Sequence, residues 1–226
     1  MLIAVVVYLF PSFSLSNATK ETSYQSSVTT ETSKTTNATT GTAMQALDEL
    51  EVKGRAPRTG YERSQFGSGW QYTDGCDMRN VILARDMTSI TRNAKCQVVS
   101  GTLEDPYTGQ VVSFRRGIKS SQAVQIDHVV ALSNAWQTGA QQLSKEERIQ
   151  LANDPLELLA VDGSANQHKS DGDAATWLPP RKAFRCEYIA RQVAIKQKYR
   201  LWVTAAEKNA MNRVLMACPG QMLPTP

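Results

Sequence analysis

Two short polar segments carry residues whose types could hydrolyse a phosphodiester bond. In the first, VQIDHVVALSNAW (124–136), Asp127 and His128 interrupt a run of apolar β-formers. A carboxylate is a hard oxygen ligand suited to Mg²⁺ or Mn²⁺, and a neutral imidazole can take a proton from water near pH 7. Phosphodiester hydrolysis uses a cation and a base. Asp127 is therefore a candidate metal ligand and His128 a candidate general base; a buried hydrogen-bonded pair at a strand end is the alternative.

The second segment is NQHKSDGD, residues 166–173. Asn166 offers a carbonyl oxygen, Lys169 a cation and Asp171 a carboxylate. His168 could be a third ligand, contact phosphate, or be a solvated loop histidine. The chain has only two histidines, which excludes a three-histidine zinc site. One divalent ion, Mg²⁺ or Mn²⁺ rather than Zn²⁺, is the cofactor that this donor set favours.

Positive charge is concentrated towards the C-terminus. Between Lys169 and Arg213 there are ten basic and four acidic residues, an excess of six that exceeds the net charge of +4 for the whole chain. Such an excess is typical of a phosphate-facing surface, although solvated helix faces would give the same pattern. The candidate phosphate contacts are Lys169, Arg181 and Arg185, with Arg79 and Arg116 behind them.

Four cysteines and an apparent export signal favour two disulfides. No pair has the CxxC spacing of a zinc ribbon. Of the three possible connectivities, we prefer the pairing that is local in sequence, Cys76–Cys96 and Cys186–Cys218. A hydrolase that uses Cys186 or Cys96 with His128 is a separate hypothesis, and it requires a free thiolate.

Composition divides the chain into four parts. An apolar run, LIAVVVYLF, precedes Pro11 and small polar residues, as in a secretory signal peptide. A tract rich in Ser, Thr and Asn follows, with almost nothing apolar to bury. We expect a signal peptide or short anchor over 1–18, a disordered linker over 19–43, a folded domain over 44–220 and a tail over 221–226. The protein is then secreted or at the cell surface, with no stable membrane span after processing.

Hydrophobic periodicity gives the elements that must position the polar segments. Helices are expected over 43–52, 76–87, 181–199 and 204–217, with further helical segments after Ala131 and after Ser144. Capping boxes at Ser144 and Glu147 and at Thr204 and Glu207 mark the starts of two of these helices. Strands over 97–103 and 110–114 flank turn residues and form a hairpin, the 124–136 segment begins with a third strand, and 156–163 holds another. This order does not alternate as a parallel α/β sheet would, so the fold class is α+β.

The strand over 156–163 ends in a VDG turn just before the second polar segment. A hairpin-like return would place Asn166 beside Asp127. Trp136, Trp177 and Trp202 stand among apolar residues, which favours core packing over base stacking.

The ordered set GCDMRNVILARDM, SGTLEDPYTG, VQIDHVVALSNAWQTGA, NDPLELLAVDG, DGDAATWLPPRKAFRCEYIARQVAIK and LWVTAAE resembles the secreted bacterial HNH endonucleases over residues 61–219. The resemblance implies a ββα-metal core embedded in a mostly helical domain with a β-hairpin. It implies His128 as general base and Asp127 and Asn166 as metal ligands. The implied substrate is nucleic acid, with DNA favoured over RNA.

One position departs from this pattern. The middle Asn of an HNH motif orders the loop that carries the base, and Glu157 stands at the matching position. Glu157 could order the loop as an acceptor, or the enzyme could be weakened. The alternative function is a catalytically weak or inactive secreted module of the same fold that binds nucleic acid or a surface partner. The sequence leaves the oligomeric state open.

Overall fold

A computed structural model describes residues 2, 9, 41–118 and 120–225 of the chain. The expected signal peptide or anchor (1–18), apart from residues 2 and 9, and all but the last residues of the expected linker (19–43) lie outside these residues. The fold begins with α1 (Ala43–Glu49), where the Thr42 side chain accepts from the Gln45 amide in a capping box. The main-chain oxygen of Gln221 accepts from the Ala43 amide, so the first residues of the expected tail pack against the start of the fold.

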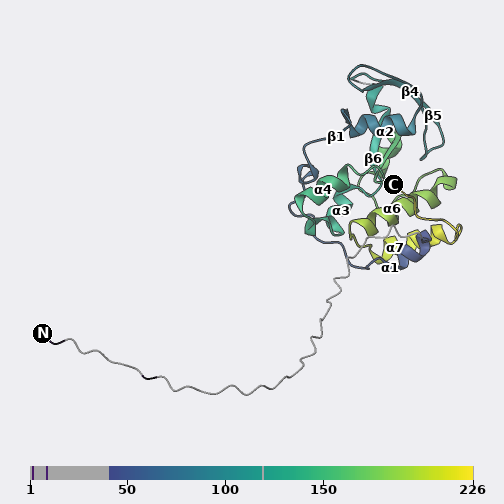
Figure 1. Cartoon of the computed structure of the whole chain (residues 1–226). Coiled ribbons are helices and arrows are strands. Elements are labelled where there is room, and N and C mark those ends of the chain that lie inside the picture. The colour runs from purple at the N-terminus through teal and green to yellow at the C-terminus, as the bar shows by residue number, and fades with distance from the viewer. Residues whose placement is uncertain (1, 3–8, 10–40, 119, 226) are drawn as a thin grey trace, which may run out of the picture. The chain divides into compact units, whose positions relative to one another are not determined.

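An antiparallel sheet of three strands lies at one end of the described fold, beside α2 (Met78–Asp86) (Figure 1). Its order is β3 (Thr88–Arg92), β4 (Val98–Glu104), β5 (Val111–Arg115). The predicted hairpin is confirmed as β4–β5. The third strand is β3, which the sequence did not reveal because four of its five side chains are exposed and no apolar alternation marks it.

Two short strands form the centre of the described fold. β6 (Val124–His128) pairs antiparallel with β7 (Leu158–Asp162), and α5 (Gly163–Lys169) follows immediately. β6 therefore pairs with β7 rather than extending the hairpin sheet. Successive strand side chains face opposite sides. One side of this pair contributes to the core beneath α2, and the other side contributes to a larger core under the helices.

The larger core is enclosed by helices. Figure 1 shows α1, α6 and α7 together, with α3 and α4 nearby. These elements are α3 (Leu132–Gln137), α4 (Lys145–Ala152), α6 (Arg185–Lys198) and α7 (Ala205–Leu215). Both predicted capping boxes are present, at the starts of α4 and α7. Trp136 and Trp202 are buried, as their apolar neighbours predicted.

The remaining elements are short: β1 (Tyr72–Thr73), β2 (Cys76–Asp77), and the 3₁₀ turns η1 (Arg63–Phe66), η2 (Ser120–Gln122), η3 (Ala140–Gln142) and η4 (Lys182–Phe184). Mixed helices and small antiparallel sheets make the fold α+β, as predicted. Within the described ranges, no helix combines the length and the apolar character needed to cross a bilayer.

Both predicted disulfides are present. Cys76–Cys96 joins the start of α2 to the start of β4, and Cys186–Cys218 joins the first turn of α6 to the segment after α7. All four cysteines of the chain are therefore oxidised. Because a cysteine nucleophile needs a free thiolate, this pairing excludes the Cys/His hydrolase.

Candidate active site

A pocket of about 580 Å³ brings the two polar segments together. Asp127 and His128 reach it from the end of β6, Asn166 from α5, and Asp171 from the loop after α5. The antiparallel pairing of β6 with β7 produces this meeting, because α5 begins where β7 ends. The juxtaposition expected from a hairpin-like return is thus found.

His128 is held as a neutral imidazole. The residue is only 6% exposed, and its ring stacks on that of Trp70, with centroids 5.8 Å apart. Nε2 lies 3.0 Å from the main-chain oxygen of Ala152. A carbonyl oxygen only accepts, so Nε2 carries the proton and Nδ1 carries the lone pair. Burial, and secondarily the charge of Arg63, lowers the pKa of His128 to about 3.

Asp127 is a buried carboxylate with two donors. Its Oδ1 accepts from Lys169 Nζ at 2.8 Å, and its Oδ2 accepts from the Tyr107 hydroxyl. Burial raises the pKa of Asp127, while the Lys169 charge and these hydrogen bonds oppose the rise. Lys169 also donates to the main-chain oxygen of His128 at 2.7 Å, so one ammonium fixes both members of the Asp-His pair.

This placement corrects the expected role of Lys169 as a phosphate contact. Its side chain is fully buried and does not line the pocket. The physical reason is that α5 packs on β6, where the buried Asp127 carboxylate requires a compensating cation. Lys169 therefore contacts Asp127 and His128 rather than the space of the pocket.

The pocket residues fit a divalent cation whose coordination shell would be completed by water and substrate. The Asn166 amide nitrogen donates to Gln125 Oε1 at 2.9 Å, which leaves the Asn166 carbonyl oxygen for a ligand. Each Asp127 oxygen accepts one hydrogen bond from a side chain and retains a second lone pair. These are two hard oxygen donors, as Mg²⁺ and Mn²⁺ prefer. In the described residues, no three His, Cys, Asp or Glu side chains are grouped so that they could hold a metal ion between them.

Three arginines line the same pocket: Arg58, Arg63 and Arg79. Arg79 was a secondary candidate from the sequence, and it also donates to the Val124 main-chain oxygen at 3.0 Å. Arg58 and Arg63 were missed, because they belong to a loop-like stretch without periodicity. Three arginines within RAPRTGYER were the available signal.

The other predicted phosphate contacts lie elsewhere. Arg181 is exposed beside Gly109, and Arg185 lines a different pocket. Arg116 donates to Asn80 and to the Val98 main-chain oxygen, which is a structural role. None of these three side chains lines the pocket around His128.

Glu157 holds the loop that follows the candidate base. It is fully buried, and its carboxylate oxygens lie 3.2 and 3.1 Å from the amide nitrogen of Val130. Its main-chain oxygen accepts from the Val129 amide at 2.9 Å. Burial raises the pKa of Glu157 well above its usual value. Glu157 is therefore an acceptor for the loop, at the position where the HNH pattern has an Asn.

The two remaining auxiliary candidates differ in position. His168 is exposed on α5 and is absent from the lining of the pocket. Asp171 lines it, accepts from the Ser133 hydroxyl at 3.3 Å, and lies 3.9 Å from Arg58. Asp171 thus adds one acidic group to a rim otherwise rich in arginine.

Comparisons with known proteins bear on this pocket. No solved structure matches the chain. An uncharacterized secreted protein of Arthroderma benhamiae is 35% identical over 179 residues, covering 78% of this chain and 85% of the relative. This relative is fungal, whereas the sequence resemblance was to bacterial proteins. The model of the GmrSD restriction endonuclease C-terminal domain matches residues 77–214, more than half of the chain and all of β6, β7 and α5. The chain belongs to the family of this GmrSD C-terminal domain.

Proposed function

We propose that the protein is a secreted, metal-dependent HNH-type endonuclease that hydrolyses phosphodiester bonds, with DNA favoured over RNA. The observation that carries the proposal is the pocket itself. It combines a neutral imidazole of fixed tautomer, two hard oxygen donors and three arginines. Membership of a family described by restriction endonucleases supports the same reaction class.

His128 is the general base in this proposal. Its Nε2 proton is committed to Ala152, so Nδ1 is the atom that accepts a proton from the attacking water. A phosphate anion in the pocket would stabilise the imidazolium and raise the pKa of the ring from its low value in the free protein. Trp70 and the Ala152 carbonyl keep the ring from rotating.

Asp127 and Asn166 are the residues that would hold Mg²⁺ or Mn²⁺. The bound ion would neutralise charge on the phosphate and on the departing oxygen. Lys169 and Tyr107 orient the Asp127 carboxylate. Because Lys169 already compensates the Asp127 charge, we expect a weakly held ion completed by water and a phosphate oxygen.

Arg58, Arg63 and Arg79 bind the phosphodiester in this proposal. Guanidinium groups pair with phosphate oxygens through two parallel hydrogen bonds and keep their charge at every physiological pH. Arg79 is anchored to β6 through the Val124 main-chain oxygen, which fixes it beside the Asp-His pair. Contacts to the backbone carry no sequence information, so we expect little sequence specificity.

Export fits two further observations. The relative from Arthroderma benhamiae is described as secreted. Both disulfides of the chain are formed, and such bonds persist in oxidising compartments.

The proposal is tested by cleavage of plasmid DNA and of RNA with Mg²⁺, Mn²⁺ and Zn²⁺ in turn. Wild type should cleave DNA with Mg²⁺ or Mn²⁺, and His128→Ala should lose at least about a hundredfold in rate, as expected for removal of a general base. His168→Ala is the matched control, because this second histidine is exposed and outside the pocket. Full activity of His128→Ala would remove the assigned base.

A second candidate function is a catalytically inactive secreted module that binds nucleic acid. Two observations favour it. Glu157 stands in place of the middle Asn, and the Asp127 carboxylate is already paired with Lys169, which weakens its attraction for a metal ion. Pocket-dependent binding of DNA that stays intact with both Mg²⁺ and Mn²⁺ would select this function over the nuclease.

A further inference from the structure

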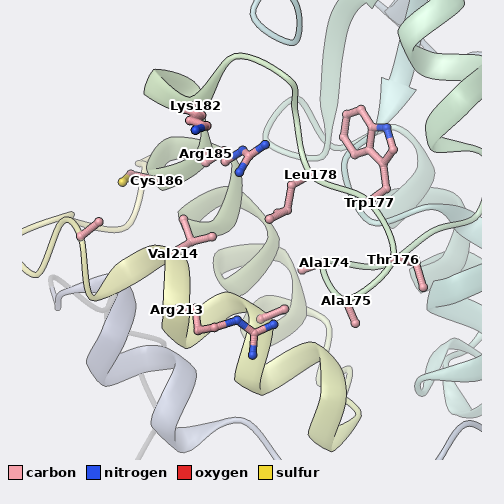
Figure 2. A pocket seen from close by; sticks show the side chains of 12 residues that line it. Ala174, Ala175, Thr176, Trp177, Leu178, Lys182, Arg185, Cys186, Arg213 and Val214 are labelled. Carbon is pink, nitrogen blue, oxygen red and sulfur yellow. The ribbon is translucent and has the colours of Figure 1, made fainter.

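A second pocket, of about 530 Å³, lies between the 174–178 loop and helices α6 and α7 (Figure 2). It shares no lining residue with the candidate active site. Three cationic side chains line it: Lys182, Arg185 and Arg213. No acidic residue lines it. Within the described residues, none of these three cations has a carboxylate oxygen within 4.0 Å.

Apart from Thr176, the rest of this pocket is apolar. Trp177, Leu178 and Val214 line it together with alanines. Trp177 is half-buried, with its ring packed against Tyr107 and Tyr188 at 5.0 and 5.7 Å between centroids. The pocket therefore combines unpaired positive charge with an aromatic and aliphatic surface.

The walls of the pocket are fixed before any ligand arrives. Asp173 is buried, pairs with Arg55 at 2.7 Å, and accepts from the Ala175 amide at 3.0 Å, which holds the 174–178 loop. The Cys186–Cys218 disulfide ties the start of α6 to the end of α7. A preformed site loses less conformational entropy on binding.

The two pockets are close along the chain. Asp171 lines the candidate active site and Ala174 lines the second pocket. Three residues of chain span at most about 11 Å. A strand of a few nucleotides would therefore reach from one pocket to the other.

We propose that this second pocket binds a single-stranded stretch of nucleic acid that flanks the bond being cleaved. The phosphates would lie against Lys182, Arg185 and Arg213, and a base would pack on the exposed part of Trp177 with Leu178 and Val214. Proteins that bind single strands combine a basic groove with stacking side chains in this way. The inference rests on the proposed nuclease function and extends it to substrate length.

A strand is favoured over a small inorganic anion by the composition of the site. Phosphate alone would use the three cations and leave the apolar floor exposed to water. A nucleotide unit would contact both the cations and the apolar floor. A nucleic acid strand could bind here and in the neighbouring active site at the same time, which a free nucleotide could not.

The test measures binding of a fluorescent twelve-nucleotide DNA strand in EDTA, with strand integrity checked on a gel. Lys182→Glu/Arg213→Glu is compared with Lys95→Glu/Lys145→Glu, which changes the net charge by the same amount at exposed positions outside both pockets. We expect about tenfold or more weaker binding by the first variant, and a salt slope smaller by about 1.4, at 0.7 per lost contact. The affinity of the control variant should stay within about twofold of that of wild type.

Thermal unfolding checks that each variant is folded. Lys182→Gln/Arg213→Gln repeats the binding test without added negative charge.

Further measurements distinguish failure of this inference from failure of the proposed nuclease function. Equal affinity of both glutamate variants for the strand would overturn the inference. So would pocket-dependent binding of adenosine monophosphate without any change for the strand, because the ligand would then be a free nucleotide. Cleavage of a dinucleotide should be unchanged in Lys182→Glu/Arg213→Glu, while the KM for long strands rises. Absence of cleavage by wild type with Mg²⁺ and Mn²⁺ would instead reject the proposed function, whatever the binding result.

Discussion

The buried imidazole of His128 makes the stability of the protein depend on pH. Its pKa is about 3 in the folded chain, against 6.5 in an unfolded one. The unfolded state therefore binds more protons between these values, and stability present above pH 6.5 is lost as the pH falls towards 3. Between pH 7 and pH 5 we expect a loss of about 2 kcal/mol from this residue.

The measurement is urea unfolding of wild type and His128→Gln at both pH values, in EDTA. The glutamine keeps a side-chain donor but does not titrate. Its loss of stability between pH 7 and pH 5 should be smaller than that of wild type by about 2 kcal/mol. Identical losses in the two proteins would mean that His128 is not held neutral by burial.

The ion pair between Lys169 and Asp127 allows two roles of the lysine to be distinguished: positioning Asp127 and contacting phosphate. Lys169→Met leaves a buried carboxylate without its cation, and we expect about 3 to 5 kcal/mol lower stability. Asp127→Leu/Lys169→Met should recover part of this loss, since both charges are then gone.

Lys145→Met is the matched control, because Lys145 is exposed on α4. A lysine that only contacts phosphate would behave like Lys145, with unchanged unfolding. Such a result for Lys169→Met, read from urea denaturation, would contradict the positioning role.

The residues of the candidate site were predictable to different degrees. Asp127 and His128 stood out because polar groups of these types are rare in strongly apolar surroundings. Asn166 stood out through its place in the second polar segment and through the resemblance to HNH endonucleases. Lys169 could be found but not placed, since a lysine that faces phosphate and one that faces a buried carboxylate look alike in sequence. Arg58 reaches the pocket from a loop and Arg63 from the start of the short 3₁₀ turn η1, where no periodicity gives a direction.

The elements were predictable where local signals are strong. Capping boxes gave the starts of α4 and α7, and turn residues gave the β4–β5 hairpin. The partner of each strand was not predictable from such signals. β7 is buried on both sides, because Leu158 and Ala160 pack in one core and Leu159 and Val161 pack in the other. A strand buried on both sides has no alternation to define its neighbour.

The loop between β6 and α3 depends on an element distant in sequence, the start of β7. Glu157→Ala removes the acceptor for the buried Val130 amide, which we expect to cost about 1 to 3 kcal/mol. Glu157→Gln retains an acceptor oxygen and should cost less. Hydrogen exchange at Val130 is the direct measurement, with faster exchange in the alanine variant than in the glutamine variant.

If Glu157 orders this loop, Glu157→Ala should also lower the rate of DNA cleavage, because the loop follows His128 directly. Unchanged exchange at Val130 in Glu157→Ala would show that the loop is held by other contacts, such as the hydrogen bond from Val129 to the Glu157 main chain.

Across the whole described fold, positive charge is divided between two pockets. The basic excess between Lys169 and Arg213 appeared in the sequence as one cluster. The fold uses it in several ways: Lys169 and Lys196 are buried in ion pairs, whereas Lys182, Arg185 and Arg213 surround the second pocket. Arginines from outside this cluster line the candidate active site. Sequence counts gave the sign of the charge, and packing determined where it acts.

The disulfides are the remaining constraint on the whole fold, and they make its stability depend on redox conditions. Cys186–Cys218 spans 32 residues and Cys76–Cys96 spans 20. In the chain-entropy model, loops of these lengths stabilise by about 3 to 4 kcal/mol each, with the longer loop contributing slightly more. We expect Cys186→Ala/Cys218→Ala to lose about this amount in urea unfolding under non-reducing conditions. Dithiothreitol should then destabilise wild type by more than it destabilises this variant, which has only one disulfide left to lose. Equal unfolding midpoints of wild type with and without dithiothreitol would show that the folded protein does not rely on these bonds.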